Sequence, residues 1–206
     1  MADIHYLENP LETEELLELL CPPVRNWFKD KFPDFTEPQK LAIPAIMNQD
    51  HLLLCSPTGS GKTLTAFLSI IDQLVRRALD NKLDKRVYCV YISPIKALAN
   101  DIERNLIGPL TEIKESYLPS RAQEIKVGLR TGDTPQSERQ KMLRNPPHIL
   151  ITTPESLAIA ITSPRFQPIV SEVEYMIVDE LHSLVPSKRG VHLALTLSYL
   201  DTLLTR

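Results

Sequence analysis

Short apolar runs alternate with longer amphipathic stretches from residue 51 to the end of the chain. The apolar runs have the length of strands and lie at His51–Cys55, Val87–Ser93, Ile125–Arg130, His148–Thr152 and Tyr175–Asp179. The stretches between and after them carry apolar residues at helical spacing and lie at Lys62–Leu79, Pro94–Leu106, Pro135–Leu143, Pro154–Ile161 and Val191–Leu204. Because the strands are apolar on both faces, the pattern predicts an α/β fold with a mostly parallel sheet and helices on both faces.

The first fifty residues have a different pattern, which predicts short helices without strands. Leu11–Leu20 carries apolar residues at helical spacing and is ended by two prolines. Val24–Phe32 can form a second helix, and Thr36 suits the N-cap of a third. We therefore divide the chain into a helical N-terminal extension, residues 1–33, and one α/β domain, residues 34–206.

Composition narrows the class of protein. The chain has 206 residues, of which 43% are hydrophobic and 24% charged, so it can bury a substantial core. Its net charge of −3 excludes a protein whose whole surface is a polycation. Any nucleic-acid site therefore has to be a local one.

The cysteines and the N-terminus indicate the compartment. Three cysteines are too few for a disulfide framework or a zinc cluster, and Cys55 and Cys89 lie in apolar runs, where we expect small buried thiols. The N-terminus is acidic where a signal peptide is basic, and the apolar runs are far shorter than the roughly 20 residues of a membrane span. We expect a cytoplasmic protein that has no membrane partner.

Three predicted β–α junctions contain a hydroxyl residue followed by proline: Ser93–Pro94, Thr134–Pro135 and Thr153–Pro154. In such a pair the hydroxyl residue can cap the next helix, and proline suits its first position. Each junction would leave free N–H groups at the carboxyl edge of the sheet, where α/β proteins bind ligands and helix N-termini favour phosphates. The same pair also begins helices that bind nothing, so the pattern alone leaves both interpretations open.

The segment SPTGSGKT, residues 56–63, matches a phosphate-binding loop between a strand and a long helix. Its two glycines allow successive N–H groups to turn inward around a phosphate. Lys62 would reach the β- and γ-phosphates, and the Thr63 hydroxyl would bind Mg²⁺. Ser56 stands where the strict pattern has glycine, which should affect the start of the loop and not the cradle. The predicted nucleotide-binding residues of the loop are Ser56, Thr58, Gly59, Ser60, Gly61, Lys62 and Thr63.

A pair of acidic residues, Asp179 and Glu180, follows the last apolar strand. Asp179 would hold Mg²⁺ through its water shell, and Glu180 could act as general base on an attacking water. An Asp-Glu pair after a strand is common, but together with the loop at residues 56–63 it predicts a site for nucleotide hydrolysis. The predicted catalytic residues are thus Lys62, Asp179 and Glu180, and the predicted metal ligands are Thr63 and Asp179.

The order of these motifs resembles that in superfamily-two helicases of the DExH type. The sequence DELH at residues 179–182 resembles the DExH box, and SPTGSGKT looks like the family's form of the phosphate-binding loop. SPIKALA at 93–99, RTGD at 130–133 and TPES at 153–156 resemble further motifs of the superfamily. The likeness is strongest to the large helicase-related (Lhr) family, for example in "RTGDTPQSERQKM" and "IVDELHSLVPSKRGVHLAL".

The resemblance implies the first RecA-like domain of a motor that uses ATP and Mg²⁺ and binds single-stranded DNA or RNA. Gln39 would read adenine, and His182 would link the ATP site to the nucleic acid or to a partner domain. Lys188, Arg189 and Gly190 fit a phosphate contact and a solvated loop equally well. The residues that would hold the nucleic-acid backbone, without reading bases, are Ser93, Pro94, Lys96, Arg130, Thr131, Gly132, Asp133, Thr153, Pro154 and Glu155.

Some parts of such a motor are missing from the sequence. No Ser-Ala-Thr motif follows residues 179–182, and no second RecA-like domain supplies arginine fingers. We therefore expect a piece of a longer chain that contains the second RecA-like domain, and little hydrolysis by this domain alone. Two alternatives remain: a P-loop ATPase that is not a nucleic-acid motor, or a nucleic-acid-binding module with a weak nucleotide site.

Overall fold

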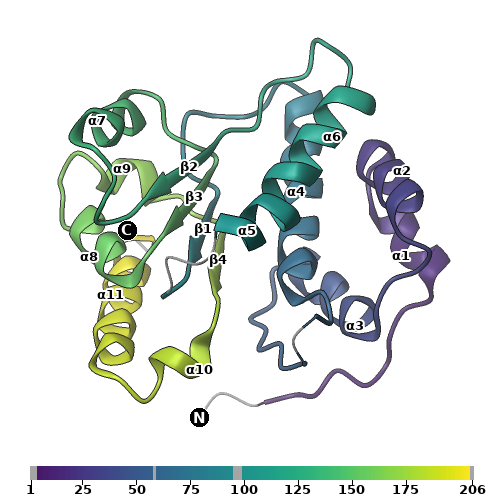
Figure 1. Cartoon of the computed structure of the whole chain (residues 1–206), viewed down its shortest axis with the longest axis horizontal. Helices are drawn as coiled ribbons and strands as arrows, with labels where there is room; N and C mark the ends of the chain where they lie inside the picture. Colours follow the sequence, from purple (N-terminus) through teal and green to yellow (C-terminus); the bar gives the residue numbers. More distant parts are fainter. Residues whose placement is uncertain (1–3, 58, 95–98, 205–206) are drawn as a thin grey trace. The chain divides into compact units, whose positions relative to one another are not determined.

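The computed structural model describes residues 4–57, 59–94 and 99–204 (Figure 1). The chain forms two compact units. The helical unit consists of Met1–Lys82 with Asp101–Gln123, and the sheet unit consists of Leu83–Asn100 with Glu124–Arg206. Thr58 and Lys96, two of the predicted site residues, lie outside the described residues.

The helical unit is built around α4, and α2, α3 and η2 all pack against it. α1 packs on α3, and α6 packs on α2. α4 has the bounds that its apolar pattern predicts, and its apolar side chains are buried. The helices of this unit are α1 (Thr13–Leu19), α2 (Pro22–Lys31), α3 (Glu37–Met47), α4 (Lys62–Leu79), the π-helical η2 (Glu103–Ile107) and α6 (Gly108–Ser116); α5 (Ala99–Ile102) lies where the chain passes into this unit.

A buried carboxylate fixes the two N-terminal helices to α4. Asp72 of α4 is fully buried, and its Oδ1 accepts a hydrogen bond of 2.6 Å from the Cys21 N–H at the start of α2. Arg76 binds the other oxygen of Asp72 at 2.7 Å and donates to the Leu19 carbonyl. A buried charge is tolerated only when it is paired in this way. The predicted extension therefore packs within the helical unit, and Pro22 begins α2 as well as following α1.

The sheet unit contains a four-stranded parallel sheet, which confirms the predicted α/β class (Figure 1). The strand order is β2-β3-β1-β4, and in the register Val90 of β1 lies beside Leu150 of β3 and Met176 of β4. The strands are β1 (Cys89–Ile92), β2 (Val127–Arg130), β3 (Ile149–Thr152) and β4 (Tyr175–Val178), and the helices are α7 (Gln136–Arg144), α8 (Pro154–Ile161), α9 (Gln167–Val170), α10 (Leu181–Leu184) and α11 (Lys188–Leu204).

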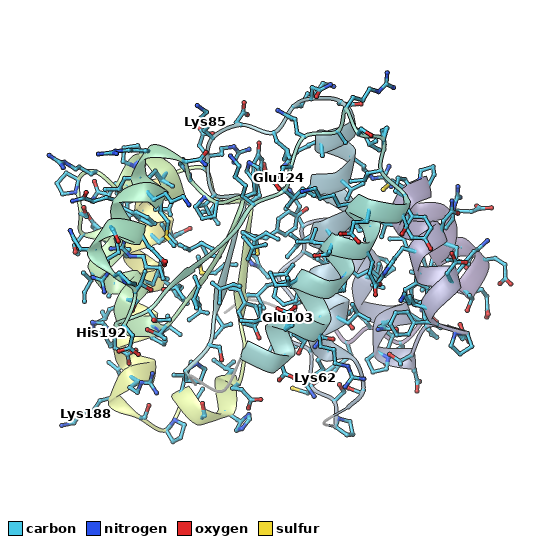
Figure 2. All side chains as sticks on the ribbon, turned by 45° about the horizontal axis from the view of Figure 1, so that its top comes forward. Lys62, Lys85, Glu103, Glu124, Lys188 and His192 are labelled. Carbon is cyan, nitrogen blue, oxygen red and sulfur yellow. The ribbon has the colours of Figure 1, made fainter. Side chains whose placement is uncertain are left out.

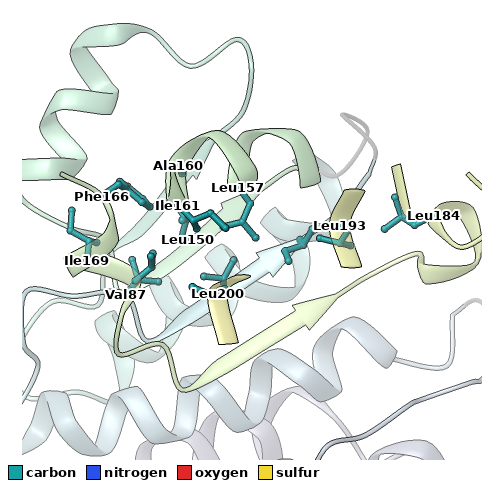
Figure 3. Close-up of a cluster of buried hydrophobic side chains, with 13 residues drawn as sticks. Val87, Leu150, Leu157, Ala160, Ile161, Phe166, Ile169, Leu184, Leu193 and Leu200 are labelled. Carbon is teal, nitrogen blue, oxygen red and sulfur yellow. The ribbon is translucent and has the colours of Figure 1, made fainter. Parts of the chain in front are cut away.

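The core of the sheet unit lies between one face of the sheet and the helices α8 and α11, which also pack against each other (Figure 3). Val90, Ile92 and Leu150 point into it from the strands, in the alternation that a strand imposes. Leu157 of α8 and Leu193 of α11 pack against this face from the helices. All five side chains are at most 3% exposed.

The predicted first strand, His51–Cys55, is wrong. The structure assigns these residues to no helix or strand, Leu53 is 72% exposed, and Cys55 is exposed where a buried thiol was predicted. An apolar run becomes a strand only through hydrogen bonds to a neighbouring strand, and the structure, which describes residues 51–55 in full, pairs them with no strand.

Two further predictions, on the cysteines and on membrane spans, can be compared with the structure. Cys21 and Cys89 are free and buried, and burial raises the pKa of Cys21 to about 12. No helix in the described part of the chain combines the length and apolar character needed to cross a bilayer.

Candidate nucleotide and nucleic-acid site

The predicted phosphate-binding loop has the backbone that a phosphate cradle requires. Gly59 and Gly61 have φ angles of 82° and 85°, in the left-handed region that favours glycine. A Cβ at Gly59 would meet nothing within 4 Å, so the space beside this residue is open. Gly61 is the N-cap of the 18-residue α4, which places the free N–H groups of the helix start at the loop.

Ser56 and Lys62 tie the two sides of the loop together. The Ser56 hydroxyl oxygen lies 2.5 Å from that of Ser60. Lys62 Nζ donates to the carbonyls of Ser56 at 2.5 Å and Pro57 at 2.8 Å, while Thr63 follows in the first turn of α4. The serine that departs from the strict pattern therefore closes the start of the loop and leaves the glycine positions unchanged.

Gln39 supports the same loop from α3. Its side chain is 3% exposed, and its Oε1 accepts a hydrogen bond of 2.9 Å from the Thr36 N–H at the helix start. Its Nε2 is so near Gly61 that a Cβ there would lie 2.9 Å from it. Thr36 Oγ1 donates to the Ser60 carbonyl at 3.0 Å. The residue predicted to read adenine thus also connects the start of α3 to the phosphate-binding loop.

Asp179 lies directly after β4, as predicted. Its N–H donates to the Ile92 carbonyl at 2.9 Å, which fixes it beside β1. Its Oδ1 accepts the Glu180 N–H at 2.8 Å, and its Oδ2 accepts a hydrogen bond from the Tyr91 hydroxyl. Tyr91 is not among the predicted site residues. It belongs to no motif, and its one signal is a polar group on a strand adjacent to β4.

Glu180 has a backbone conformation that is uncommon for a residue other than glycine. Its φ of 52° and ψ of 37° are left-handed, and it is the N-cap of α10. Its Oε2 lies 3.1 Å from Nε2 of His182, whose side chain is 82% exposed. Strained residues of this kind cluster at functional sites, which supports the role predicted for Glu180.

The predicted catalytic residues and metal ligands are divided between the two units. Lys62 and Thr63 belong to the helical unit, whereas Asp179 and Glu180 belong to the sheet unit. Among the described residues, no group of three or more His, Cys, Asp or Glu side chains could hold a metal ion. The predicted Mg²⁺ site does not need such a group, because phosphate and water oxygens complete the coordination around one or two protein ligands.

Two of the predicted β–α junctions differ in their capping. Thr153 is the N-cap of α8, with Pro154 as first helical residue, and its Oγ1 accepts the Ser156 N–H at 3.3 Å, as predicted. Ser93 is fully buried; its N–H donates to the Thr152 carbonyl at 3.1 Å. Its hydroxyl has no hydrogen-bond partner among the residues that the structure describes. The helix predicted after Pro94 falls partly outside the described residues.

The TGD segment forms a turn that is held by Thr134 and Arg139. Thr134 Oγ1 accepts the Thr131 N–H at 2.8 Å, and Arg139 Nη2 donates to the carbonyls of Thr131 at 3.1 Å and Gly132 at 2.9 Å. The prediction that Thr134 caps the next helix is wrong, because Pro135 is the N-cap of α7 and the hydroxyl closes the turn instead. Gly132 and the adjacent Asp133 are exposed.

Arg130 places a buried positive charge beneath this turn. It is 8% exposed, and its guanidinium carbon lies 4.7 Å from the centroid of the Phe166 ring. Burial and the charge of Arg139 lower the pKa of Arg130, which stays charged all the same. Two arginines at one turn give an acidic protein a local positive site. A cavity of ≈ 30 Å³ there is lined by Arg130, Thr131, Gly132, Arg139, Ser156 and Ile159.

Glu155 has an ion-pair partner in the first turn of α11, where Figure 2 labels Lys188. Nε and Nη2 of Arg189 lie 2.5 and 3.2 Å from the two carboxylate oxygens of Glu155, and Nη2 also donates to the Pro94 carbonyl at 3.1 Å. The pair lowers the pKa of Glu155 and raises that of Arg189. Arg189 is therefore helical and paired, and not part of a solvated loop.

Comparison with known proteins agrees with this assembly of motifs. Residues 36–205 match the DEAD/DEAH box helicase family. The chain belongs to this family. It is 51% identical to the ATP-dependent helicase Lhr-Core of Methanocaldococcus jannaschii, over 98% of the chain and 24% of that protein. It is 44% identical to the Lhr helicase/uracil glycosylase of Escherichia coli, over 96% of the chain and 13% of that protein.

A solved structure of another family member confirms the predicted fold. The Mycobacterium smegmatis helicase Lhr bound to ssDNA and AMP-PNP aligns with a TM-score of 0.80 and 44% identity, over 91% of this chain and 23% of that one. The RecA-like class and the resemblance to the Lhr family are thereby confirmed. The chain spans about a quarter of the length of its archaeal Lhr-Core relative.

Proposed function

We propose that the chain is the ATP-binding motor domain of an ATP-dependent DNA or RNA helicase or translocase. The observation that carries this proposal is the loop with left-handed Gly59 and Gly61 ahead of Lys62, in a member of the DEAD/DEAH box helicase family. The relatives named ATP-dependent helicases and the Lhr structure bound to ssDNA and AMP-PNP support it.

The helical unit would bind the nucleotide. The loop N–H groups and the start of α4 suit the phosphates of ATP, because successive donors and the positive end of a helix favour an anion. Lys62 would turn from the two carbonyls that it now contacts toward the β- and γ-phosphates. Gln39 would read adenine with the hydrogen-bonding capacity that the cap of α3 leaves free.

Magnesium fits the oxygen groups of this chain. The Thr63 hydroxyl and the Asp179 carboxylate are hard ligands of the kind that Mg²⁺ prefers, and we infer that they hold it together with the phosphates. When bound, the ion would neutralise charge on the transferring phosphoryl group. Tyr91 and the Glu180 N–H orient the Asp179 carboxylate. Glu180 would accept a proton from the attacking water.

The sheet unit would hold a single strand of nucleic acid through its backbone. The cap of α8 at Thr153 and the turn at Gly132 offer N–H and hydroxyl donors, and Arg130 adds positive charge. Donors of this kind bind phosphate oxygens without reading bases. A local basic site of this kind would explain how a chain with a net charge of −3 binds a polyanion.

A motor of this kind needs a partner domain. We propose that a second RecA-like domain of the same full-length protein supplies further charge at the ATP site and that ATP closes the two domains on the strand. The domain alone should then hydrolyse ATP poorly. The free cysteines are in keeping with a reducing cytoplasm as its compartment.

The test compares two variants of the full-length protein. Lys62→Ala should abolish ATP binding, whereas Glu180→Gln should bind ATP and lose hydrolysis by about 100-fold or more. Nucleotide affinity should change when a single-stranded oligonucleotide is added. Unchanged hydrolysis in Glu180→Gln would remove the general base. If the nucleotide affinity does not change when the oligonucleotide is added, the result would favour an ATPase that is not a nucleic-acid motor.

A further inference from the structure

The first turn of α11 contacts three segments that are far apart in the sequence. Arg189 binds both carboxylate oxygens of Glu155, at the start of α8, and the carbonyl of Pro94, after β1. The next residue, Gly190, lies against Leu184 at the end of α10. One turn of helix thus connects two predicted nucleic-acid-binding segments with α10, the helix that Glu180 caps.

The contact between α10 and α11 is too close to give way. A Cβ at Gly190 would lie 2.3 Å from the carbonyl oxygen and 2.8 Å from the carbonyl carbon of Leu184, so no side chain fits there. The N–H and hydroxyl of Ser187 both bind the same carbonyl, at 2.9 and 2.8 Å. Leu184 itself is fully buried. A shift of Glu180 and α10 would therefore carry the start of α11 with it.

The side chain of Arg189 is suited to hold Glu155 and the Pro94 carbonyl at the same time. A guanidinium presents its donors in a fixed planar fork, so it can hold a carboxylate with two of them and a carbonyl as well. The ion pair is 44% exposed at Arg189 and 48% exposed at Glu155. Exposed pairs add little to the stability of a fold. This pair is an exception to that rule, because Arg189 binds both carboxylate oxygens of Glu155 and its Nη2 makes a third hydrogen bond to the Pro94 carbonyl.

We propose that Arg189 is a positioning residue that couples the Glu180 segment to the junctions at Pro94 and Glu155. This inference rests on the proposed function, because the coupling has a use only if Glu180 serves hydrolysis and those junctions hold nucleic acid. Binding of the strand at Glu155 and Pro94 would then set the position of Glu180 through Arg189 and α10, so that the strand stimulates hydrolysis.

The experiment measures ATP hydrolysis by the full-length protein against the concentration of a single-stranded oligonucleotide. Arg189→Ala and Glu155→Gln should each raise the concentration for half-maximal stimulation by about ten-fold, toward the lower end of the roughly 5–150-fold effects typical of coupling between two sites. The double variant should match either single variant, because both remove one shared interaction. Arg189→Lys should behave like Arg189→Ala, since lysine lacks the fork. Arg165→Ala removes an exposed arginine of the same unit and should act like the unaltered protein.

Other outcomes would overturn the inference in distinguishable ways. If Arg189 bound a phosphate itself, Arg189→Lys would keep the normal oligonucleotide dependence, and Glu155→Gln would tighten binding by removing a negative charge. If the two residues acted independently, their effects would add in the double variant. If the oligonucleotide stimulates ATP hydrolysis by the unaltered protein and by Arg189→Ala at the same concentration, the coupling is disproved and the proposed function is not. An unaltered protein that the oligonucleotide does not stimulate would overturn the proposed function and the coupling together.

Discussion

The hydroxyl of Tyr91 donates a hydrogen bond to Oδ2 of Asp179, from β1 to the end of the adjacent parallel strand β4. The other carboxylate oxygen accepts the Glu180 N–H at 2.8 Å. A carboxylate that is held at both oxygens keeps one orientation. Groups that orient a metal ligand in this way commonly contribute 10–100-fold, as an order of magnitude, to metal affinity or activity.

Replacing Tyr91 by phenylalanine should therefore weaken the use of magnesium. The change removes the hydroxyl and keeps the buried ring, so we expect thermal stability to change little. We expect the Mg²⁺ concentration for half-maximal ATP hydrolysis by the full-length protein to rise about ten-fold. Tyr199→Phe, which removes the hydroxyl of a 43% exposed tyrosine, is the matched control. An equal Mg²⁺ dependence in both variants would show that Tyr91 does not orient Asp179.

Gln39 allows support of the loop to be separated from recognition of adenine. Gln39→Glu keeps an oxygen for the Thr36 N–H but loses the amide donor that lies beside Gly61. Gln39→Ala loses both, and the loss of its half of the capping box with Thr36 should lower the free energy of unfolding by about 1 kcal/mol. We expect both variants to bind ATP more weakly and Gln39→Glu to lose its preference for ATP over GTP.

Titration calorimetry with the two nucleotides and thermal unfolding of each variant would check this. An equal loss of affinity for ATP and GTP in Gln39→Glu would restrict Gln39 to supporting the loop. A loss of stability in Gln39→Glu as large as in Gln39→Ala would show that the glutamate does not replace the cap.

The sequence predicts those elements whose pattern is local. α4 and α8 have the predicted bounds, because each carries a continuous apolar stripe and begins at a recognisable residue, Lys62 after a glycine or Pro154 after a hydroxyl residue. β1 and β3 were predictable as apolar runs that are buried throughout. The predicted strand at 51–55 failed, because strand formation depends on a partner that the run itself does not specify.

The candidate site divides in the same way. The motifs are enough to propose Lys62 and Asp179 as site residues, since the chemistry of phosphate binding fixes residue types at a fixed spacing. They do not identify Tyr91, which contacts a residue 88 positions later, or the partner that Glu155 finds 34 positions later in Arg189. The Thr134 hydroxyl could cap the next helix or accept the Thr131 N–H, and only the folded turn determines that it does the second. Such contacts depend on tertiary structure.

Gly190 should tolerate no side chain. In Gly190→Ala the new Cβ would overlap the Leu184 carbonyl, which is backbone and cannot move aside without shifting α10. We expect the free energy of unfolding to fall by about 2 kcal/mol or more, as for overpacked sites, in a denaturant titration. Gly132→Ala is the matched control, because its Cβ would meet nothing within 4 Å. Equal stability of the two variants would contradict the close approach of α10 and α11.

His148 should make the sheet unit less stable in mild acid. The side chain is 5% exposed, and its Nδ1 accepts the Lys126 N–H at 3.0 Å. Burial, and next the charge of Lys126, lower the pKa of His148 from 6.5 to about 4. Between these two values the unfolded chain binds a proton at His148 that the folded chain does not. The contribution of His148 to the free energy of unfolding is therefore complete above pH 6.5 and is lost as the pH decreases toward 4. The loss should reach on the order of 3 kcal/mol.

The variant His148→Asn isolates this effect, because asparagine offers an oxygen to the Lys126 N–H and does not titrate. Urea unfolding, followed by circular dichroism, is measured for both proteins at about pH 7.5 and about pH 4.5, on either side of the unfolded pKa. The unaltered protein should lose more stability than His148→Asn between these pH values, and the difference reports His148 alone, since the carboxylates of both proteins titrate equally. Equal losses would mean that His148 is protonated in the folded protein, and therefore that its ring reaches water despite its burial at the start of β3.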